Sequence, residues 1–114
     1  MRTTHARIID ARKNKALAEK EIARAIRSGA VIVYPTDTVY GVGCDARCAA
    51  AVRRIRALKG RSFAKPFSVI APNKKWIQEN CALSPQAAEF LAKKMPEPYT
   101  MILRLKNKRC VDRT

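Results

Sequence analysis

Apolar residues recur at a helical spacing near the start of the chain and then form a continuous run. The chain from Lys15 to Ser28 is predicted to form an amphipathic helix that Gly29 ends. The apolar face of this helix carries Leu17, Ile22, Ala25 and Ile26. Residues 30–34, AVIVY, are rich in β-branched side chains and predict a strand buried on both faces, which Pro35 ends.

A loop and a second helix are predicted next. Residues 36–46, TDTVYGVGCDA, are rich in Gly, Thr and Asp, which is typical of a loop that leaves a strand end. A helix is predicted from Cys48 to Leu58, with Gly60 closing it. Its inward face carries Val52, Ile55 and Leu58. Its outward face carries Arg53, Arg54 and Arg56.

Further strands and helices alternate in the second half of the chain. The predicted strands are residues 67–71 (FSVIA) and 99–105 (YTMILRL). A short helix is predicted to begin near Asn73. Ser84 followed by Pro85 is a typical helix start and predicts a helix to about Lys94. The inward residues of that helix are Ala87, Phe90 and Leu91.

Strands that alternate with helices argue for a layered α/β domain, in which ligands bind at the carboxyl ends of the strands. A length of 114 residues and a hydrophobic content of 47% fit one domain with its own core. We therefore expect a single domain over residues 1–114, with tails at 1–14 and 106–114. Because residues 106–114 contain no closing helix or strand, the alternative is that the chain is the front part of a longer domain.

Charge and cysteine content restrict the class of protein. There are 24 Lys and Arg against nine Asp and Glu, and the formal net charge of +15 predicts an anionic partner. The sequence holds neither an apolar stretch of roughly 18–20 residues nor the apolar core of a signal peptide, so we expect a cytoplasmic protein without membrane association. The four cysteines are expected to be reduced, and a single histidine, His5, is poor material for a zinc site.

The basic residues are concentrated where acids are absent. Between Ala46 and Gln78 there is no acidic residue. The basic residues of this stretch are Arg47, Arg53, Arg54, Arg56, Lys59, Arg61, Lys65, Lys74 and Lys75. A solvated helix face explains the arginines at 53, 54 and 56 as well as a binding role does. The loop from Lys59 to Lys65, KGRSFAK, fits phosphate binding better, because small residues bring backbone N–H groups beside three cations.

A second candidate site lies in YPTDTVYGVG, residues 34–43. Thr36 and Thr38 supply hydroxyls, Asp37 supplies a carboxylate, and Gly41 and Gly43 permit close approach of the backbone to a ligand. The alternative is an ordinary turn after a strand, with Asp37 as a capping residue.

Together these motifs resemble the YrdC-like family of threonylcarbamoyl-adenylate synthases. The resemblance rests on YPTDTVYGVGCDA, ALKGRSFAKPFSVIA and PEPYTMILRL, and runs from about Ala16 to Leu105. It implies an α/β fold with a twisted, open, mixed sheet and flanking helices around a basic concave surface. It also implies condensation of L-threonine, bicarbonate and ATP to threonylcarbamoyl-AMP with release of pyrophosphate, for tRNA threonylcarbamoyladenosine. Family members are linked to double-stranded RNA as well.

The resemblance also implies roles for individual residues. Thr36 matches the contact to threonine, Lys59 and Arg61 match the K-x-R that holds ATP phosphates, and Thr100 matches a nucleotide contact. Carbamate attack on the α-phosphorus builds charge on phosphoryl oxygens, which Lys59 and Arg61 would stabilise together with Mg²⁺. The carbamate is already an anion, so no general base is required. We expect no metal site built by the protein itself.

The sequence departs from the family pattern in two places. Glu97 stands where the family's P-G-P-x-T has glycine, and the later V-R-x-P and S-x-N motifs have no counterpart.

Three hypotheses about function follow. The first is a synthase whose missing site residues come from a partner chain or a C-terminal part. The second is a non-catalytic module that binds tRNA or double-stranded RNA. The third is a carbamoyl-adenylate role like that of hydrogenase maturation proteins. The RNA-binding candidates are Arg53, Arg54, Arg56 and Lys65. An open sheet edge after Leu105 also makes a homo-oligomer plausible.

Overall fold

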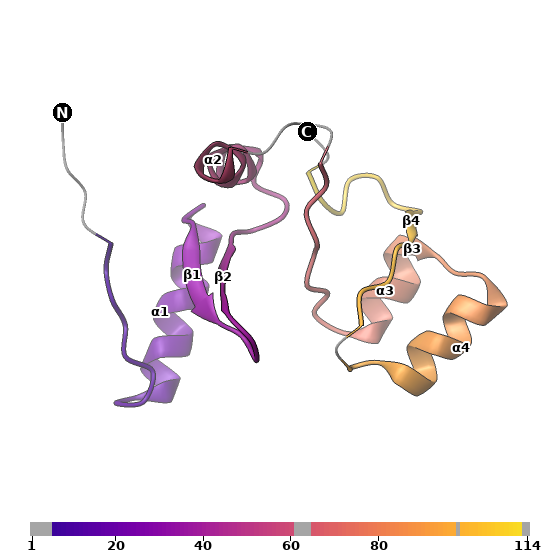
Figure 1. The fold of residues 1–114 in the computed structure, drawn as a ribbon, viewed down its shortest axis with the longest axis horizontal. Helices are drawn as coiled ribbons and strands as arrows, with labels where there is room; N and C mark the ends of the chain where they lie inside the picture. The colour runs from indigo at the N-terminus through magenta and orange to yellow at the C-terminus, as the bar shows by residue number, and fades with distance from the viewer. Residues whose placement is uncertain (1–5, 61–64, 98, 113–114) are drawn as a thin grey trace.

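The computed structural model describes residues 6–60, 65–97 and 99–112 (Figure 1). Its elements are α1 (Lys15–Arg27), β1 (Ile32–Pro35), β2 (Tyr40–Gly43), α2 (Ala49–Lys59), α3 (Lys74–Asn80), β3 (Cys81–Ala82), α4 (Pro85–Lys94) and β4 (Arg104–Leu105). Figure 1 places α1 and the β1–β2 hairpin on one side, and α3, α4, β3 and β4 on the other. The predicted mixed α/β class is confirmed.

All four predicted helices are present, and their ends follow from local capping. The side-chain oxygens of Asn14, Asn73 and Ser84 each accept a hydrogen bond from a backbone N–H three residues on, at 3.0, 2.8 and 3.1 Å. Helix α2 has no side-chain cap at Cys48, and it ends at Gly60, which is left-handed with φ 60°. Every described helix is too short or too polar to cross a membrane.

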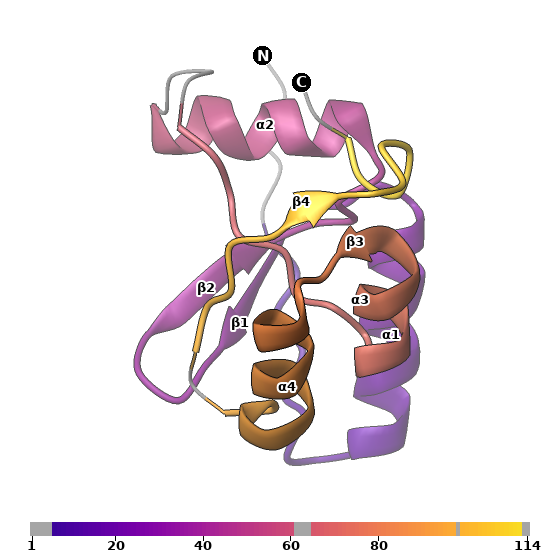
Figure 2. The ribbon, with the colours of Figure 1, turned by 90° about the vertical axis from the view of Figure 1, so that its right-hand side faces the viewer.

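The first predicted strand is present as β1, but its surroundings differ from the prediction. It pairs antiparallel with β2, in register Ile32 to Gly43 and Pro35 to Tyr40 (Figure 2). The prediction of a loop through residues 36–46 is therefore wrong for residues 40–43. Burial on both faces is also wrong, because Val33 is 67% exposed and only alternate residues of β1 are covered. One face of the hairpin is therefore largely open to solvent.

The two later strand predictions are largely wrong. Residues 67–71 lie outside the assigned strands, and of residues 99–105 only Arg104–Leu105 form a strand. That strand pairs antiparallel with Cys81–Ala82, which the sequence pattern did not indicate. Ile70 and Ile102 are 78% and 97% exposed. In the described residues the strands thus form two separate two-stranded ladders, not one open sheet, because residues 67–71 and 99–103 belong to neither ladder.

Helix α2 shows where helical periodicity predicts burial correctly and where it does not. Ile55 is buried and Val52 half-buried, as predicted. Leu58, predicted to face inward, is 70% exposed, and Arg56, predicted to face outward, is buried. Lys65 and Phe67 contact the Arg56 side chain, whereas Leu58 stays exposed. Burial here is set by a contact distant in sequence.

The described core is small for the length of the chain. The buried apolar residues are Ala18, Ala51, Ile55, Cys81 and Leu91. The radius of gyration is 16.0 Å, against about 13 Å for a compact domain of this length. The accessible surface is 9720 Å², whereas a compact monomer of 12.8 kDa exposes roughly 6,300 Å². Much apolar surface therefore lies uncovered by this chain.

The described parts of both segments expected to be tails contact the rest of the chain. Arg7 forms an ion pair with Glu21 of α1 at 2.9 Å. The backbone N–H groups of residues 106 and 107 donate to the carbonyl of Asn80 at 2.8 and 3.1 Å. The N–H of Asp112 donates to the carbonyl of Ala46 at 2.7 Å, so residues 106–112 bridge the two sides of the molecule.

Candidate functional site

Thr36 begins the turn that joins β1 to β2. Its backbone N–H donates to the carbonyl of Val39 at 3.2 Å, and its hydroxyl donates to the same carbonyl. The hydroxyl oxygen also accepts from the N–H groups of Thr38 and Val39, at 3.3 and 3.1 Å. Thr36 is exposed, yet its hydroxyl is oriented by the turn itself. The sequence therefore fixes this side chain through local hydrogen bonds, as in other Ser/Thr turns.

The two glycines of β2 make room for a tyrosine. Tyr34 of β1 pairs with Gly41 across the ladder. A Cβ built on Gly41 would lie 2.9 Å from Cζ of Tyr34, and one on Gly43 would lie 2.9 Å from Cε1. The sequence predicts that Gly41 and Gly43 permit close approach of the backbone to a ligand. In the structure the group that lies close to both glycines is the Tyr34 ring. On this face the glycines are required by packing within the hairpin.

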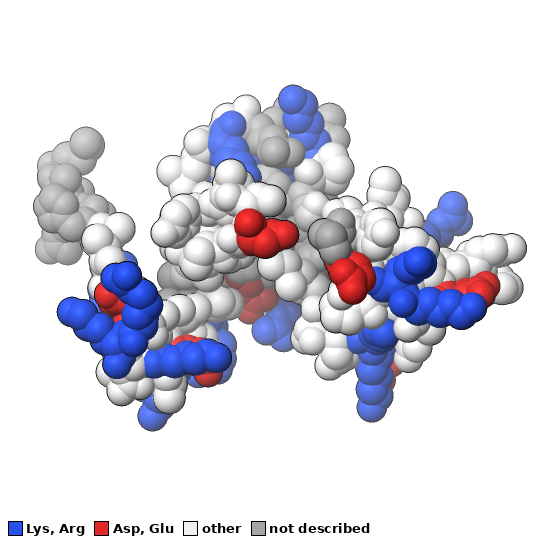
Figure 3. Space-filling model, turned by 60° about the horizontal axis from the view of Figure 1, so that its bottom comes forward, with Lys and Arg blue, Asp and Glu red and all other residues white. Residues whose placement is uncertain are grey.

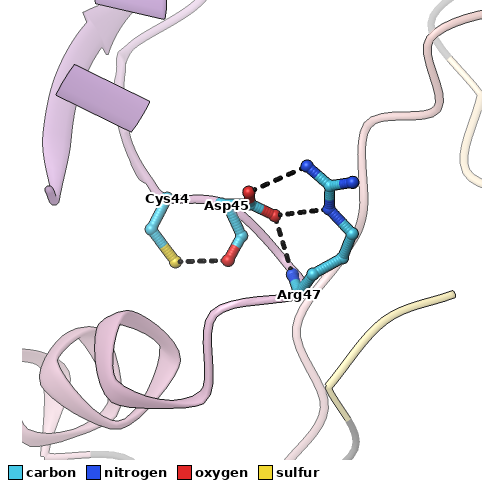
Figure 4. Close-up of polar contacts among 3 residues, drawn as sticks. All are labelled: Cys44, Asp45 and Arg47. Carbon is cyan, nitrogen blue, oxygen red and sulfur yellow. Dashed lines mark hydrogen bonds and ion pairs between the residues drawn. The ribbon is translucent and has the colours of Figure 1, made fainter. Parts of the chain in front are cut away.

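A carboxylate fixes the entry to α2, as Figure 4 shows. Asp45 accepts hydrogen bonds from the backbone N–H of Arg47 at 2.9 Å and from its guanidinium at 3.1 and 3.0 Å. These bonds hold the pKa of Asp45 below its usual 3.8. The thiol of Cys44 lies 3.5 Å from the Asp45 carbonyl, and burial raises its pKa. Arg47, grouped above with the cations of the acid-free stretch, is thus paired.

Sequence reasoning missed this arrangement, although a signal was present. The tripeptide Asp-Ala-Arg occurs at residues 10–12 and again at 45–47. At the first copy Asp10 accepts from the N–H and guanidinium of Arg12 in the same way, each bond being 3.0 Å long. The same three residues therefore form the same local structure twice, once before α1 and once before α2.

The predicted phosphate contacts lie at and beyond the end of α2. Lys59 is exposed and is the last residue of the helix, where a cation is stabilised by the helix dipole. Arg61 lies outside the described residues. Lys65 is exposed, and its carbonyl accepts from Nη1 of Arg56 at 3.1 Å. The basic residues of this region therefore differ in exposure. Lys59 and Lys65 are exposed, whereas Arg56 is buried.

The remaining candidates differ in exposure. Arg53 and Arg54 are exposed on α2, and RNA binding by them and by Lys65 stays a prediction. Arg56 is 8% exposed, so its predicted outward position is wrong, and RNA binding by this residue stays an untested prediction. Its guanidinium carbon lies 4.8 Å from the centroid of the Phe67 ring. It is turned toward the following segment.

Thr100 is exposed and follows a residue that is anchored to α4. The ring of Tyr99 makes an edge contact with Phe90, with centroids 5.3 Å apart and planes at 75°. The N–H of Tyr99 also donates to the carbonyl of Glu97 at 2.6 Å. A shallow hollow on α4 is lined by Gln86, Glu89, Phe90, Lys93 and Lys94, none of which was a predicted site residue.

The described candidates come from separate parts of the fold. In Figures 1 and 2 the turn of residues 36–39 lies at the end of the hairpin away from α2. The segment before β4, which includes Thr100, runs on the side of α4. The structure therefore does not bring the 36–39 turn beside the C-terminal end of α2. Thr36, Lys59 and Thr100 are nevertheless each exposed on their own elements.

Most acidic residues of the described chain form ion pairs with neighbouring cations. Figure 3 shows Lys and Arg in several separate groups on one face, with acids beside some of them. The ion pairs of the described residues include Arg7–Glu21, Arg12–Asp10, Lys15–Glu19, Arg47–Asp45, Lys75–Glu79 and Lys93–Glu89. With 24 basic and nine acidic residues in the chain, most cations cannot be matched by an acid of their own.

The residues around Lys59 do not fit a magnesium site built by the protein. Mg²⁺ is held in proteins by carboxylates together with waters and substrate phosphates. The sequence from 46 to 78 holds no carboxylate, and the described residues contain no cluster of three or more His, Cys, Asp or Glu able to hold a metal. No step is therefore assigned to a metal held by this chain.

Four helices, two short antiparallel ladders and the exposed Lys59 at the end of α2 describe a mixed α/β protein. The chain matches the Sua5/YciO/YrdC family model, which carries the description "Telomere recombination", over residues 24–114. This match covers most of the chain and includes Thr36, Lys59, Arg61 and Thr100. The chain belongs to this family, as the resemblance of its motifs predicted.

Similar proteins carry a common name. The threonylcarbamoyl-AMP synthase of Thiobacillus denitrificans is 42% identical over 79 residues, which is 68% of this chain and 42% of that protein. The human threonylcarbamoyl-AMP synthase is 40% identical over 79 residues, 68% of this chain and 28% of its own length. That of Nitrosococcus oceani is 43% identical over 84 residues, 71% of this chain and 44% of its own. The chain spans less than half the length of these relatives. No solved structure gives a significant match.

Proposed function

We propose that this chain acts in the synthesis of threonylcarbamoyl-AMP from L-threonine, bicarbonate and ATP, for tRNA threonylcarbamoyladenosine. The observation that carries the proposal is the family match over residues 24–114, together with relatives of 40–43% identity that bear the name threonylcarbamoyl-AMP synthase. All four proposed contacts to substrates fall inside the matched range.

The reaction has two steps. The amine of threonine and bicarbonate combine to a carbamate with loss of water. A carbamate oxygen then attacks the α-phosphorus of ATP, the bond from that phosphorus to the bridging oxygen breaks, and pyrophosphate leaves with the electron pair. Negative charge grows on the phosphoryl oxygens, so fixed cations and correct orientation supply most of the catalysis.

Lys59 and Arg61 are the residues proposed to stabilise that charge. Lys59 is exposed at the end of α2, next to Gly60, whose left-handed conformation turns the chain immediately after it. In the same scheme Thr36 binds threonine and Thr100 contacts the nucleotide. Mg²⁺ is proposed to enter with the phosphates of ATP, since the surrounding sequence offers no carboxylate to hold it.

Further polypeptide is proposed to complete the pocket. The V-R-x-P and S-x-N motifs of the family have no counterpart in these 114 residues, and apolar side chains such as Ile70 and Ile102 are largely exposed. A partner segment that supplies those motifs and covers such side chains is consistent with both observations. We propose cytoplasmic action on the tRNA modification pathway for the complete assembly.

The test is release of pyrophosphate, measured with and without threonine and bicarbonate. We expect release to require both, and to be abolished in Lys59→Ala and in Arg61→Ala. Lys20→Ala is the matched control, because Lys20 is an exposed lysine on α1. Release that persists in both site variants would overturn the assignment of these cations. Where the chain alone is inactive, the same assay is run after adding the C-terminal part of the Thiobacillus denitrificans relative.

A further inference from the structure

Arg56 is a buried cation on a helix whose other arginines are exposed. It is 8% exposed, whereas Arg53 and Arg54 on the same helix face solvent. A guanidinium is buried in proteins when its charge and donors are engaged by neighbours. The contacts of Arg56 therefore indicate what it does.

Two of these contacts reach the segment that follows the helix. Nη1 of Arg56 donates to the carbonyl of Lys65 at 3.1 Å, and the guanidinium carbon lies 4.8 Å from the centroid of the Phe67 ring. Arg56 also precedes Lys59 by three residues, a spacing that places both on one side of a helix. One side chain of α2 thus holds the backbone and the ring of the later segment.

We infer that Arg56 is a positioning residue that fixes Lys65 relative to Lys59 by holding the Lys65 carbonyl and the Phe67 ring against α2. This inference rests on the proposed function, because the use of a fixed pair of cations is to hold ATP phosphates. Lys59 and Lys65 are both exposed, so both ammonium groups are accessible to a ligand. Arg56 acts on the ligand only through the course of the backbone.

The chemistry explains why arginine serves this role better than lysine. A planar guanidinium donates a hydrogen bond in its plane while its face stacks on an aromatic ring. A lysine ammonium is a point charge on a flexible stem and lacks that face. Methionine fills a similar space and makes neither contact. The substitutions therefore separate charge from geometry.

The experiment compares Arg56→Met, Arg56→Lys and Phe67→Leu with Arg24→Met, which removes an exposed arginine from α1. ATP affinity is measured by calorimetry, and the backbone order parameter of Phe67 by nitrogen relaxation. In Arg56→Met we expect the dissociation constant for ATP to rise about tenfold, the loss typical of one hydrogen bond to a charged group. The Phe67 order parameter should fall from about 0.85 toward 0.6 or below. Arg24→Met should change neither.

The other variants keep the test decisive. Arg56→Lys retains the charge, and we expect it to recover less than half of the lost affinity. Full recovery would mean that charge alone matters and would overturn the inference. Phe67→Leu keeps the arginine and an apolar neighbour, so it serves where Arg56→Met does not fold, and it too should weaken ATP binding and mobilise residue 67. An unchanged order parameter in both Arg56→Met and Phe67→Leu would also overturn it.

Failure of the proposed function gives a different result. A wild-type chain that shows no ATP affinity, either alone or with the C-terminal part of the Thiobacillus denitrificans relative added, would overturn that function, and with it the role in nucleotide binding. Wild-type affinity that survives intact in Arg56→Met would overturn the positioning role alone. In either case the order parameter of residue 67 tests whether Arg56 holds the later segment, because this measurement requires no ligand.

Discussion

Tyr34 and Gly41 face each other across the β1–β2 ladder, and the tyrosine ring occupies the place where a side chain on Gly41 would stand. Gly43, two residues on, is covered by the same ring. On this face of the hairpin the large Tyr34 ring packs over two glycines, which have no side chain. Glycine normally weakens a strand, and here it is what allows the strands to close on the ring.

Replacing Gly41 by alanine should destabilise the protein by about 1–3 kcal/mol, the usual cost of overpacking. The new Cβ would lie 2.9 Å from Cζ of Tyr34, so the ring must move. The measurement is the free energy of unfolding in urea. The same substitution in a Tyr34→Ala background should cost much less, because the obstructing ring is gone. Equal costs in both backgrounds would show that the ring is not the obstacle.

Asp45→Asn should lower stability at pH 7 and change its dependence on pH. The pKa of Asp45 is lowered by its bonds to Arg47, so those bonds stabilise the fold above the usual carboxyl range and are lost as the pH falls through the lowered value. The side chain is 17% exposed, and we expect a loss of about 1 kcal/mol at neutral pH that shrinks below about pH 4.

Asp10→Asn provides the matched control for this prediction. Asp10 makes the same set of bonds to Arg12, but the Arg12 guanidinium is 91% exposed and solvent screens the pair. Its substitution should have a smaller effect on stability at every pH. A larger effect than that of Asp45→Asn would contradict the argument from burial.

Asn80→Ala should release the segment of residues 106–112. The Asn80 side chain is buried, donates to the carbonyl of Trp76 at 2.8 Å and accepts from the amide of Asn107 at 3.1 Å. Loss of these bonds should cost about 1–3 kcal/mol of stability. Tryptic cleavage after Lys106 and Lys108 should also become faster. Asn107→Ala removes one of the two bonds and should lie between the wild type and Asn80→Ala.

Cys44 and Cys81 should react slowly with iodoacetamide at pH 7. Burial raises the pKa of both thiols, and the thiolate is the reactive form. Cys81 is in addition only 8% exposed. We expect the alkylation of both, followed by mass spectrometry of their peptides, to accelerate many-fold in urea. Equal rates in native and unfolded protein would contradict the role assigned to burial.

The helices were predictable because their signals are local. Asn73, Ser84 with Pro85, and Gly60 each mark a helix end through bonds or dihedral angles within a few residues. Strands require a partner distant in sequence. Residues 67–71 have a strand-like composition and lie outside the assigned strands, whereas the glycine-containing residues 40–43 form a strand that pairs with β1, where Tyr34 lies opposite Gly41.

The sequence was sufficient to predict the family of the candidate site. It was not sufficient to predict what each side chain does there. The motifs around Thr36 and Lys59 identified the family, since they are short and contiguous. The burial of Arg56 was not predictable, because it depends on Phe67, which lies beyond the end of the helix. Helical periodicity places 53, 54 and 56 together as a charged group and contains no information about what covers each one.

The uncovered apolar side chains set the conditions under which this protein can be handled. A charge of +15 keeps copies apart at low ionic strength, while Ile70 and Ile102 offer exposed apolar contacts. The screening length falls from about 10 Å at 0.1 M salt to about 3 Å at 1 M. Concentrated salt, the usual means of stripping nucleic acid from a basic protein, would remove the repulsion and leave the apolar attraction. Purification of this chain is therefore a compromise between contamination and precipitation.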